Sequence, residues 1–457
     1  MRNLTKIETI SKQLFTRTGL VERLTAEKPF KERKFKLTGI IPYATSNKEL
    51  ELVIDNNNHM GLVLQTPFLN EVIKDKLNNL YTKNLLGEKV EKKTLDLFSG
   101  CITSDTSTDW VYYRNGWEVF KDMLIQNGLV EFTKNIDSSF LENRGTDIDK
   151  QTKAWDRLVK LEKTKIEYTT MFLKKQASVY SFYLSNGLPM LHRDNIDEAL
   201  DLSVELNNAA ITLSQSYGYP YQLSFNVHES VLQSSKANRK LRQAILEEAR
   251  FGDDFESLSF KLVNHGIEKS SIQIENFSKL LNLMESIKGN NKTTVLLNAD
   301  PALSIVALER GCDIVGTAVG SSITVRRSKP TPNLKIGNGN YLNFMNLENL
   351  PYQDVVEKFF NEDTGLEDGS LPHFCDSCKY LTQAKLKVDI QMWNVKRKEH
   401  KGSCITELNQ EVHNELEKPD GSLWASVSDR IDRSIYKNYK DLILKPVTNL
   451  RAMQFVE

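Results

Sequence analysis

Residues 221–263 read YQLSFNVHESVLQSSKANRKLRQAILEEARFGDDFESLSFKLV, and this stretch decides the fold. An apolar run of strand length opens it at residues 221–225, and a second lies at residues 258–263. Between the two runs, Leu241, Ile245 and Ala249 recur at helical spacing. A strand, a helix and a second strand in this order predict a βαβ unit, whose two strands lie parallel in one sheet.

The same alternation continues along the chain on both sides of this unit. Further apolar runs of strand length lie at residues 35–41, 50–54, 177–184, 294–297 and 313–317. Helical patterns lie at residues 150–176, 196–203, 277–287 and from residue 301 onward. Because several units follow one another without a reversal, the pattern favours an α/β fold of the (β/α)8 TIM-barrel type over an open sheet.

The domain organisation follows from where this pattern holds and where it fails. We expect an N-terminal extension at residues 1–34 and the barrel at residues 35–345. Residues 66–148 are rich in Asn, Lys and Asp and fit the alternation poorly, so we interpret them as an insertion between early strands. Residues 346–457 then form a C-terminal region that binds zinc.

Composition excludes several classes of protein. Lys and Arg total 60 and Asp and Glu total 60, so the net charge of zero favours no class of partner. No apolar run approaches the roughly 18 residues that a membrane span needs, and the first 30 residues do not resemble a signal peptide. Five cysteines, an odd number, suit a reducing compartment better than a disulfide framework. We therefore expect a soluble cytoplasmic protein.

A cluster of soft ligands near the C-terminus predicts a metal site. His373, Cys375 and Cys378 lie within six positions, and His400 follows after a gap of helix length. Thiolate and imidazole are the ligands of closed structural zinc sites, so these four residues are predicted to bind one Zn²⁺. The fourth ligand stays open, because Cys404 and His413 lie close behind His400.

If the fold is a barrel, its chemistry belongs at the carboxyl ends of its strands. The polar residues at those positions include Asp55, Asn186, Asn226, His228, Asn264, His265, Asn298 and Asp300. Amides and imidazoles match the donors and acceptors of a flat polar ligand such as a nucleobase. A structural interpretation also exists, since Asp300 before Pro301 is a favourable helix N-cap.

The zinc segment resembles that of the tRNA-guanine transglycosylases. Their motif, Cys-x-Cys-x-x-Cys and a later His, is similar to residues 371–378 with His400, except that His373 replaces the first Cys. Residues 295–301 and 306–313 are similar to the family's penultimate strand, turn and helix. The resemblance implies a TIM barrel, a bound zinc, a nucleic-acid substrate and phosphate-contacting arginines at Arg326 and Arg327.

The resemblance breaks down at the catalytic acids. The family's nucleophilic Asp corresponds here to Gly316, and its second acid has only a loose counterpart in Asp55. A carboxylate is needed because the covalent glycosyl intermediate forms on it. Either Asp300 and Asp55 have taken over these roles, or base exchange is lost.

Three functions therefore remain open after the sequence is read. The first is exchange of a 7-deazaguanine-type base in tRNA or DNA, and the second is a catalytically silent barrel that binds nucleic acid or assists an active protein partner. The third is an unrelated barrel enzyme with a stabilising zinc. Residues 379–401 carry seven Lys or Arg against two acids, including the run 396–398, which is consistent with a nucleic-acid backbone.

Overall fold

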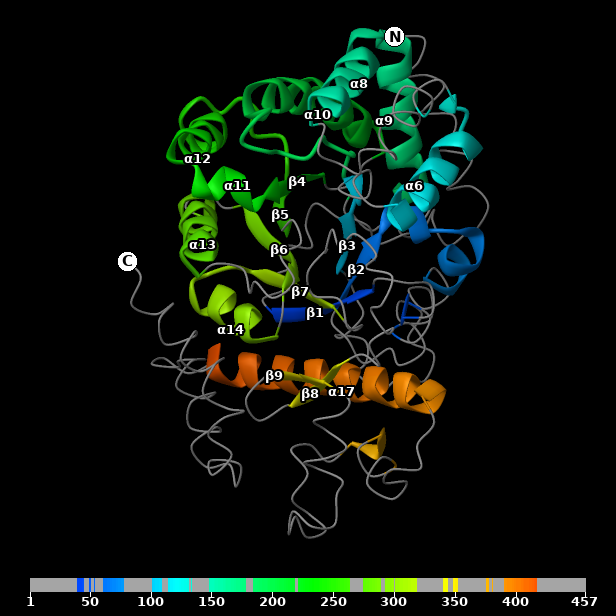
Figure 1. The fold of residues 1–457 in the computed structure, drawn as a ribbon, viewed down its shortest axis with the longest axis vertical. Helices are drawn as coiled ribbons and strands as arrows, with labels where there is room; N and C mark the ends of the chain where they lie inside the picture. Colours follow the sequence, from blue (N-terminus) through cyan, green and yellow to red (C-terminus); the bar gives the residue numbers. More distant parts are fainter. Residues whose placement is uncertain are drawn as a thin grey trace, which may run out of the picture.

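The computed structural model is α/β with a curved, wholly parallel sheet, surrounded by helices (Figure 1). It describes residues 39–44, 49, 50, 53, 61–77, 101–108, 114–130, 133, 148–177, 184–217, 221–263, 274–288, 292–299, 301–318, 340–343, 348–351, 375–377, 380 and 390–416.

Seven strands form the main sheet. In chain order they are β1 (Gly39–Ala44), β2 (Gly61–Gln65), β3 (Cys101–Asp105), β4 (Gln222–His228), β5 (Ser257–Val263), β6 (Thr293–Ala299) and β7 (Ile314–Ala318). Their order in the sheet is β3-β2-β1-β7-β6-β5-β4, and every neighbouring pair is parallel. The first strand therefore lies beside the last, which is the arrangement that a barrel requires.

Helices connect the strands and cover the outer face of the sheet. They are α6 (Arg114–Gln126), α8 (Ile148–Lys160), α9 (Glu162–Ala177), α10 (Ile196–Tyr217), α11 (Glu229–Gln233), α12 (Ser235–Arg242), α13 (Ile274–Lys288) and α14 (Pro301–Glu309). A 3-10 turn, η2 (Thr66–Phe68), follows β2, and a π-helical turn, η4 (Gln243–Glu247), extends α12. The predicted βαβ unit at residues 221–263 is confirmed, with α11, α12 and η4 between β4 and β5.

The sheet is strongly curved, and one ion pair shows how far. Four strands lie between β3 and β5 in the sheet, so in a flat sheet these two strands would be about 24 Å apart. Lys261 on β5 nevertheless reaches Asp105 on β3, with 2.8 Å between Nζ and Oδ2. The two side chains can meet only because the sheet curls around a common interior, as in part of an α/β barrel.

Apolar side chains fill two separate regions, one on each face of the curved sheet. The larger lies between the strands and the surrounding helices. The smaller lies inside the curl and consists of Ile41, Tyr43, Val63, Val295, Leu297 and Ile314. Side chains alternate between the two faces of a strand, so Ile41 and Tyr43 of β1 both point inward. Tyr43 lies nearer the carboxyl end of the strand, where the inward-facing residues become polar.

Some predicted elements differ from the structure. Residues 50–54 were expected to form a strand, but Glu49, Leu50 and Val53 are helical. Leu50 and Val53 are three positions apart and both fully buried, which is the spacing of one helix face. The prediction of a strand was therefore wrong at the described positions.

The range assigned to an insertion, residues 66–148, contains part of the sheet. β3 pairs with β2 over five residues, and α6 follows it. In the range 177–184, Ala177 ends α9 and Leu184 makes a single parallel bridge to Tyr221. The charged helix expected at 150–176 is two helices, α8 and α9, which break at Leu161, where the side chain is 59% exposed.

The C-terminal region adds a two-stranded antiparallel hairpin and a long helix. The hairpin consists of β8 (Asn340–Asn343) and β9 (Glu348–Pro351). The helix α17 (Ile390–Leu416) packs against β1 and β8, below the strands in Figure 1. Trp393, Leu408 and Val412 are buried along it.

Candidate functional site

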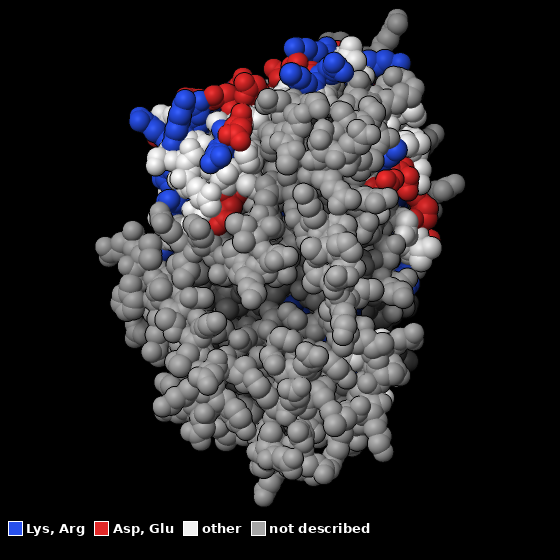
Figure 2. Space-filling view, viewed as in Figure 1, with Lys and Arg blue, Asp and Glu red and all other residues white. Residues whose placement is uncertain are grey.

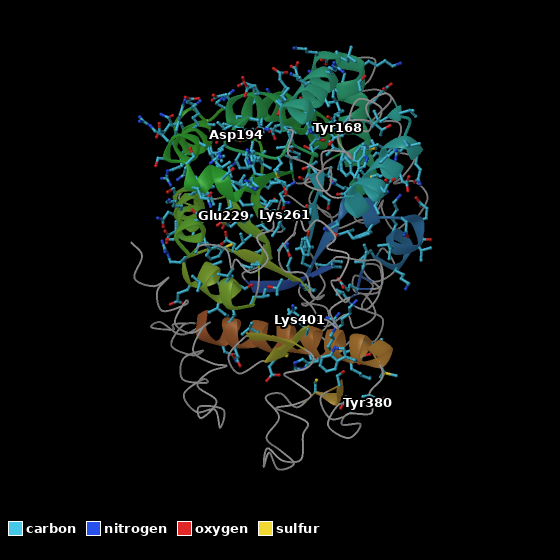
Figure 3. The ribbon with its side chains drawn as sticks, viewed as in Figure 1. Tyr168, Asp194, Glu229, Lys261, Tyr380 and Lys401 are labelled. Carbon is cyan, nitrogen blue, oxygen red and sulfur yellow. The ribbon has the colours of Figure 1, made fainter. Side chains whose placement is uncertain are left out.

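A buried ion pair lies at the carboxyl ends of the parallel strands. Asp105 is the last residue of β3, and Lys261 lies near the end of β5. The two side chains are 1% and 0% exposed, and Lys261 lies within the ring of strands in Figure 3. Removing two charges from water is costly unless they are paired and further hydrogen-bonded, so this pair requires additional partners.

Those additional partners come from three other segments. Asp105 Oδ1 accepts a hydrogen bond of 2.8 Å from the backbone N–H of Ser107, and Oδ2 accepts one from the Tyr43 hydroxyl. Gln65 Nε2 donates to the same hydroxyl at 2.8 Å. Gln65 therefore donates to Tyr43, Tyr43 donates to Asp105, and Lys261 also donates to Asp105. We call Tyr43, Gln65, Asp105 and Lys261 the interior cluster.

Asn226 joins the two edges of the described sheet. It lies on β4, 2% exposed, and its Nδ2 donates 2.6 Å to Thr108 Oγ1 in the segment that follows β3. Because β3 and β4 are the first and last strands of the sheet, this bond closes the curl at the carboxyl ends. The sequence placed Asn226 at this end of the barrel, and the structure places it beside the interior cluster.

His228 ends β4 and caps α11. Its Nδ1 accepts from the backbone N–H of Ser230 at 3.1 Å, and its ring lies 4.5 Å from that of His192, centroid to centroid. His192 directly follows Leu191, which bridges to Val227 of β4. The predicted position of His228 at the strand end is therefore confirmed, but its Nδ1 has a structural task as a helix cap.

Several polar oxygens at this end of the strands have no hydrogen-bond partner in the described structure. They are Gln65 Oε1, Thr106 Oγ1, Ser107 Oγ, Asn226 Oδ1 and Asn298 Oδ1, and all are buried. Buried polar atoms are nearly always satisfied, so such a group calls for a ligand or an ordered water. Three of the five are amide carbonyl oxygens, which can only accept.

The backbone is strained at the same place. Ser107 and Asn298 have φ of 55° and 61°, in the left-handed region that side chains other than glycine rarely adopt. Ser107 lies just beyond β3 and Asn298 near the end of β6. Non-glycine residues in this conformation cluster at ligand sites, where the surrounding structure holds them in place.

Gly316 on β7 faces the interior between Val63 and Tyr43. A Cβ built on it would lie 2.5 Å from Val63 Cγ2 and 3.6 Å from Tyr43 Cδ2. Val63 is β-branched and fully buried, so it has little freedom to move. The space that an acid would need at this position is therefore already filled.

The predicted zinc ligands are only partly described. His400 is fully buried on α17, and its Nδ1 lies 3.4 Å from Cys375 Sγ. Cys404 Sγ lies 3.4 Å from His400 Nε2 and 3.7 Å from Nδ1. Within the described ranges, no group of three or more His, Cys, Asp or Glu side chains is placed so that it could hold a metal ion.

The other predicted ligands cannot be placed. His373 and Cys378 lie outside the described residues, and His413 lies on α17 without a described side chain. The two contacts of His400 nevertheless fit soft-metal chemistry, because thiol and imidazole are the donors that zinc prefers.

The basic run on α17 is packed rather than spread as an open surface. Lys396 pairs with Glu399 at 2.9 Å and Lys398 with Glu49 at 3.0 Å. Arg397 is 6% exposed, and its burial lowers the pKa of the guanidinium, although Glu49 opposes this shift. The Lys398–Glu49 pair links α17 to a segment outside the helix, whereas the Lys396–Glu399 pair lies within the helix.

The described surface charges also mix both signs. In Figure 2, Lys and Arg side chains lie among Asp and Glu side chains along the upper edge, over α8, α10 and α12. Lys240 pairs with Asp197 there, and Arg250 with Asp201. No single-sign field covers the described residues visible in this view.

The remaining predicted site residues lie outside the described residues: Asp55, Asn264, His265, Asp300, Arg326 and Arg327.

The sequence reading missed Tyr43, Gln65, Asp105, Lys261 and His192. Two of these left a signal. Lys261 interrupts the apolar strand 258–263, and Asp105 ends a short run of strand-forming residues at 101–104. A charged residue in a buried strand is rarely left unpaired, so each of these two residues predicts a buried partner of opposite charge.

Comparison with known proteins adds no family: no protein-family model, curated protein or solved structure matches this chain. The described helices include none that is long and apolar enough to span a bilayer.

Proposed function

We propose that this chain is a protein of the tRNA-guanine transglycosylase type that receives a guanine-type base of a nucleic acid at the carboxyl ends of its strands. One observation carries the proposal: the inward ends of β2, β3, β4 and β5 are polar and buried, and they carry unpartnered acceptors beside the ion pair Asp105–Lys261. In an α/β barrel, buried polar side chains at the carboxyl ends of the strands are the first place where a binding site is expected.

The acceptors indicate what kind of ligand would fit. Gln65 Oε1 and Asn226 Oδ1 can only accept hydrogen bonds, and neither has a donor in the described structure. The amide nitrogens of the two residues already donate, to Tyr43 and Thr108 respectively. A ligand that satisfies them must present N–H groups along one edge of a flat ring. Guanine and 7-deazaguanine have such an edge, formed by a ring N–H and an exocyclic amino group, and this supports the base class that the sequence resemblance implies.

Base exchange additionally requires a carboxylate that bonds to the ribose carbon and a second acid that moves protons. Asp105 is a buried carboxylate at the end of β3, and we propose it as the acid of this site. Asp55 and Asp300 remain the proposed partners from the sequence. Asn264, His265, Arg326 and Arg327 are proposed to contact the base and the phosphates.

A second candidate function is a catalytically silent barrel that binds nucleic acid or assists an active protein partner or a second copy of itself. Two observations favour it. Asp105 is already engaged by Lys261, Tyr43 and Ser107, so its lone pairs are committed. Gly316 has Val63 packed against it, so an acid cannot be restored there without a shift.

The finer features of the architecture are part of this proposal. We propose that the segment around Leu184, which bridges to Tyr221, supplies the eighth strand of a closed (β/α)8 barrel. We also propose that a zinc-binding subdomain follows the barrel, with His373, Cys375, Cys378 and His400 as the ligand set expected from the sequence. We also propose a location in the cytoplasm, as the odd number of cysteines in the sequence suggests.

Calorimetric titration with guanine and 7-deazaguanine tests the base site. Gln65→Met and Asn226→Leu each remove one acceptor and are expected to weaken binding about tenfold, the loss of roughly one hydrogen bond. Asn207→Leu is the matched control, because Asn207 is also a buried amide with an unpartnered oxygen, but it lies on α10. Equal affinity in all three variants and the wild type would show that the base site is misplaced.

Incorporation of labelled guanine into tRNA and into DNA distinguishes the two candidate functions. Exchange that is abolished by Asp105→Asn, in a variant that still binds base, supports the enzyme. No exchange by a wild-type protein that binds the base supports the silent barrel, and exchange that survives Asp105→Asn assigns the chemistry to other acids.

A further inference from the structure

Strand β6 contains a bulge near its carboxyl end. The pairing between β6 and β7 advances three residues on β6, from Leu296 to Ala299, while it advances only two on β7. Leu297 and Asn298 therefore lie opposite a single residue of β7, Gly316. An extra residue of this kind bends a strand and redirects a side chain, and such bulges are frequent next to active sites.

The bulge changes which residues of β6 face the interior. Leu296 and Ala299 both belong to the outer apolar region, although residues three positions apart on a regular strand point to opposite faces. Leu297 belongs to the inner region, so the extra residue, Asn298, follows it on the inner side. Leu297 pairs with Lys261 of β5, which places Asn298 one residue beyond the level of Lys261, toward the carboxyl ends of the strands.

Asn298 has a combination of features that its own fold does not explain. It is 6% exposed, its Oδ1 has no hydrogen-bond partner in the described structure, and its φ is 61°. Ser107, beyond the end of β3, also has a buried side-chain oxygen without a partner and a positive φ. Such a backbone conformation and an unsatisfied buried acceptor both cost free energy, which a bound ligand or water can offset.

We propose that Asn298 binds the base at the carboxyl ends of the strands, with its Oδ1 accepting a hydrogen bond from an N–H of the base. This inference rests on the proposed function and adds an acceptor from β6 to those of Gln65 on β2 and Asn226 on β4. Free guanine carries N–H groups on both of its rings, so it can supply donors to more than two acceptors. A base that lacks the matching N–H would leave Asn298 buried and unpaired, which makes this residue a determinant of specificity.

Calorimetric titration of the full-length protein with guanine tests the role of Asn298. Asn298→Gly removes the acceptor, and glycine adopts a positive φ without steric cost, so the urea unfolding midpoint should be no lower than that of the wild type. The affinity for guanine is expected to fall about tenfold, the loss of roughly one hydrogen bond. Ala249→Gly is the matched control, because Ala249 also has a positive φ, of 45°, but is exposed and carries no polar side chain. Its affinity for guanine should equal that of the wild type.

A conservative variant separates the lost acceptor from a change in the bulge. Asn298→Asp keeps a side-chain oxygen that accepts, and aspartate tolerates a positive φ better than most residues do. It should therefore bind guanine more tightly than Asn298→Gly. An equal loss of affinity in both variants would show that the backbone of the bulge matters and the acceptor does not, which would overturn the inference.

The remaining outcomes are also decisive. Unchanged affinity in Asn298→Gly, while Gln65→Met binds more weakly, would overturn the role of Asn298, assign its oxygen to a buried water and leave the base site intact. A wild-type protein that does not bind guanine would overturn the base site and this inference with it. A urea midpoint of Asn298→Gly well below those of Ala249→Gly and the wild type would show that the side chain supports the strand, and this result too would contradict a role in binding.

Discussion

At the scale of single residues, Lys261 shows how strongly a buried charge depends on its partner. Lys261→Met leaves the carboxylate of Asp105 buried without its counter-ion, and we expect the free energy of unfolding to fall by about 3–5 kcal/mol. Urea unfolding followed by circular dichroism measures this loss. Lys160→Met is the control, because Lys160 pairs with Asp156 on the exposed face of α8 and should change stability by less than about 1 kcal/mol.

The pair itself can be separated from the unpaired charge with a second substitution. Asp105→Asn removes the negative charge and keeps one of the two side-chain oxygens, so the side chain can still accept from the Tyr43 hydroxyl or from the Ser107 backbone N–H. The double variant of Asp105→Asn and Lys261→Met should therefore be more stable than Lys261→Met alone. A double variant that loses the sum of the two single losses would show that the two residues do not stabilise each other.

Gly316 makes a second prediction at this scale. Gly316→Ala introduces a Cβ that would lie 2.5 Å from Val63 Cγ2, so we expect a loss of about 1–3 kcal/mol in thermal or urea unfolding. Gly402→Ala is the matched control: Gly402 lies within α17, and nothing lies within 4 Å of its added Cβ. That variant should gain up to about 1 kcal/mol, since alanine favours a helix more than glycine does. Equal effects at both positions would contradict the packing described around Gly316.

At the scale of elements, the end of α9 carries a lysine whose charge is unfavourable. Lys175 lies near Lys74 of the helical residues 71–77, and burial together with that neighbouring charge lowers the pKa of Lys175 from 10.5 to about 8. Glu71 opposes the shift but is mostly exposed. Below pH 8 the folded protein therefore holds a partly buried ammonium at a cost of about 3 kcal/mol, taking 1.36 kcal/mol for each pKa unit.

The pH dependence has a definite sign. Between pH 8 and 10.5 the unfolded chain keeps the proton on Lys175 and the folded protein has lost it, so stability from this group rises with pH. Lys175→Met should be more stable than the wild type at pH 7, and its advantage should shrink as the pH rises through 8. Lys174→Met, at the exposed neighbouring position, should show no such trend. Unfolding free energies of all three proteins from pH 7 to 10 measure it, and a constant difference between Lys175→Met and the wild type would contradict the lowered pKa.

At the scale of the whole molecule, the curved sheet places its first strand in the chain beside its last. β1 pairs with β7 over five residues, Gly39 to Ile314 through Tyr43 to Ala318, although these strands are far apart in the chain. Such pairing forms only when most of the chain is folded, so its amides should exchange only by global opening.

Hydrogen exchange followed by mass spectrometry tests this cooperativity. Peptides that cover β1 and β7 should share one slow exchange rate, and both should slow equally when the protein is stabilised. α12, which is short and partly exposed, is the internal comparison and should exchange faster. A peptide from β1 that exchanges much faster than one from β7 would show that β1 opens locally and does not hold the sheet together.

The later half of the fold could be predicted from the sequence. The strands β4, β5, β6 and β7 and the helices α10, α13 and α14 follow from local periodicity, because apolar side chains must repeat with the period of the element that buries them. The same logic placed Asn226 and His228 at strand ends. It failed at residues 50–54 and at β3, where short segments in polar surroundings leave little periodic signal.

Which side chains meet in the interior depends on contacts between strands that are distant in the chain. Asp105 and Lys261 are far apart in the chain, and β3 and β5 are far apart in the sheet, so no local pattern links them. The curl of the sheet brings them together because its curvature turns the inward faces of distant strands toward one interior. The basic run of α17 makes the same point: its composition resembles an open surface, and the packing of the helix brings Lys398 into an ion pair with Glu49, which is far away in the chain.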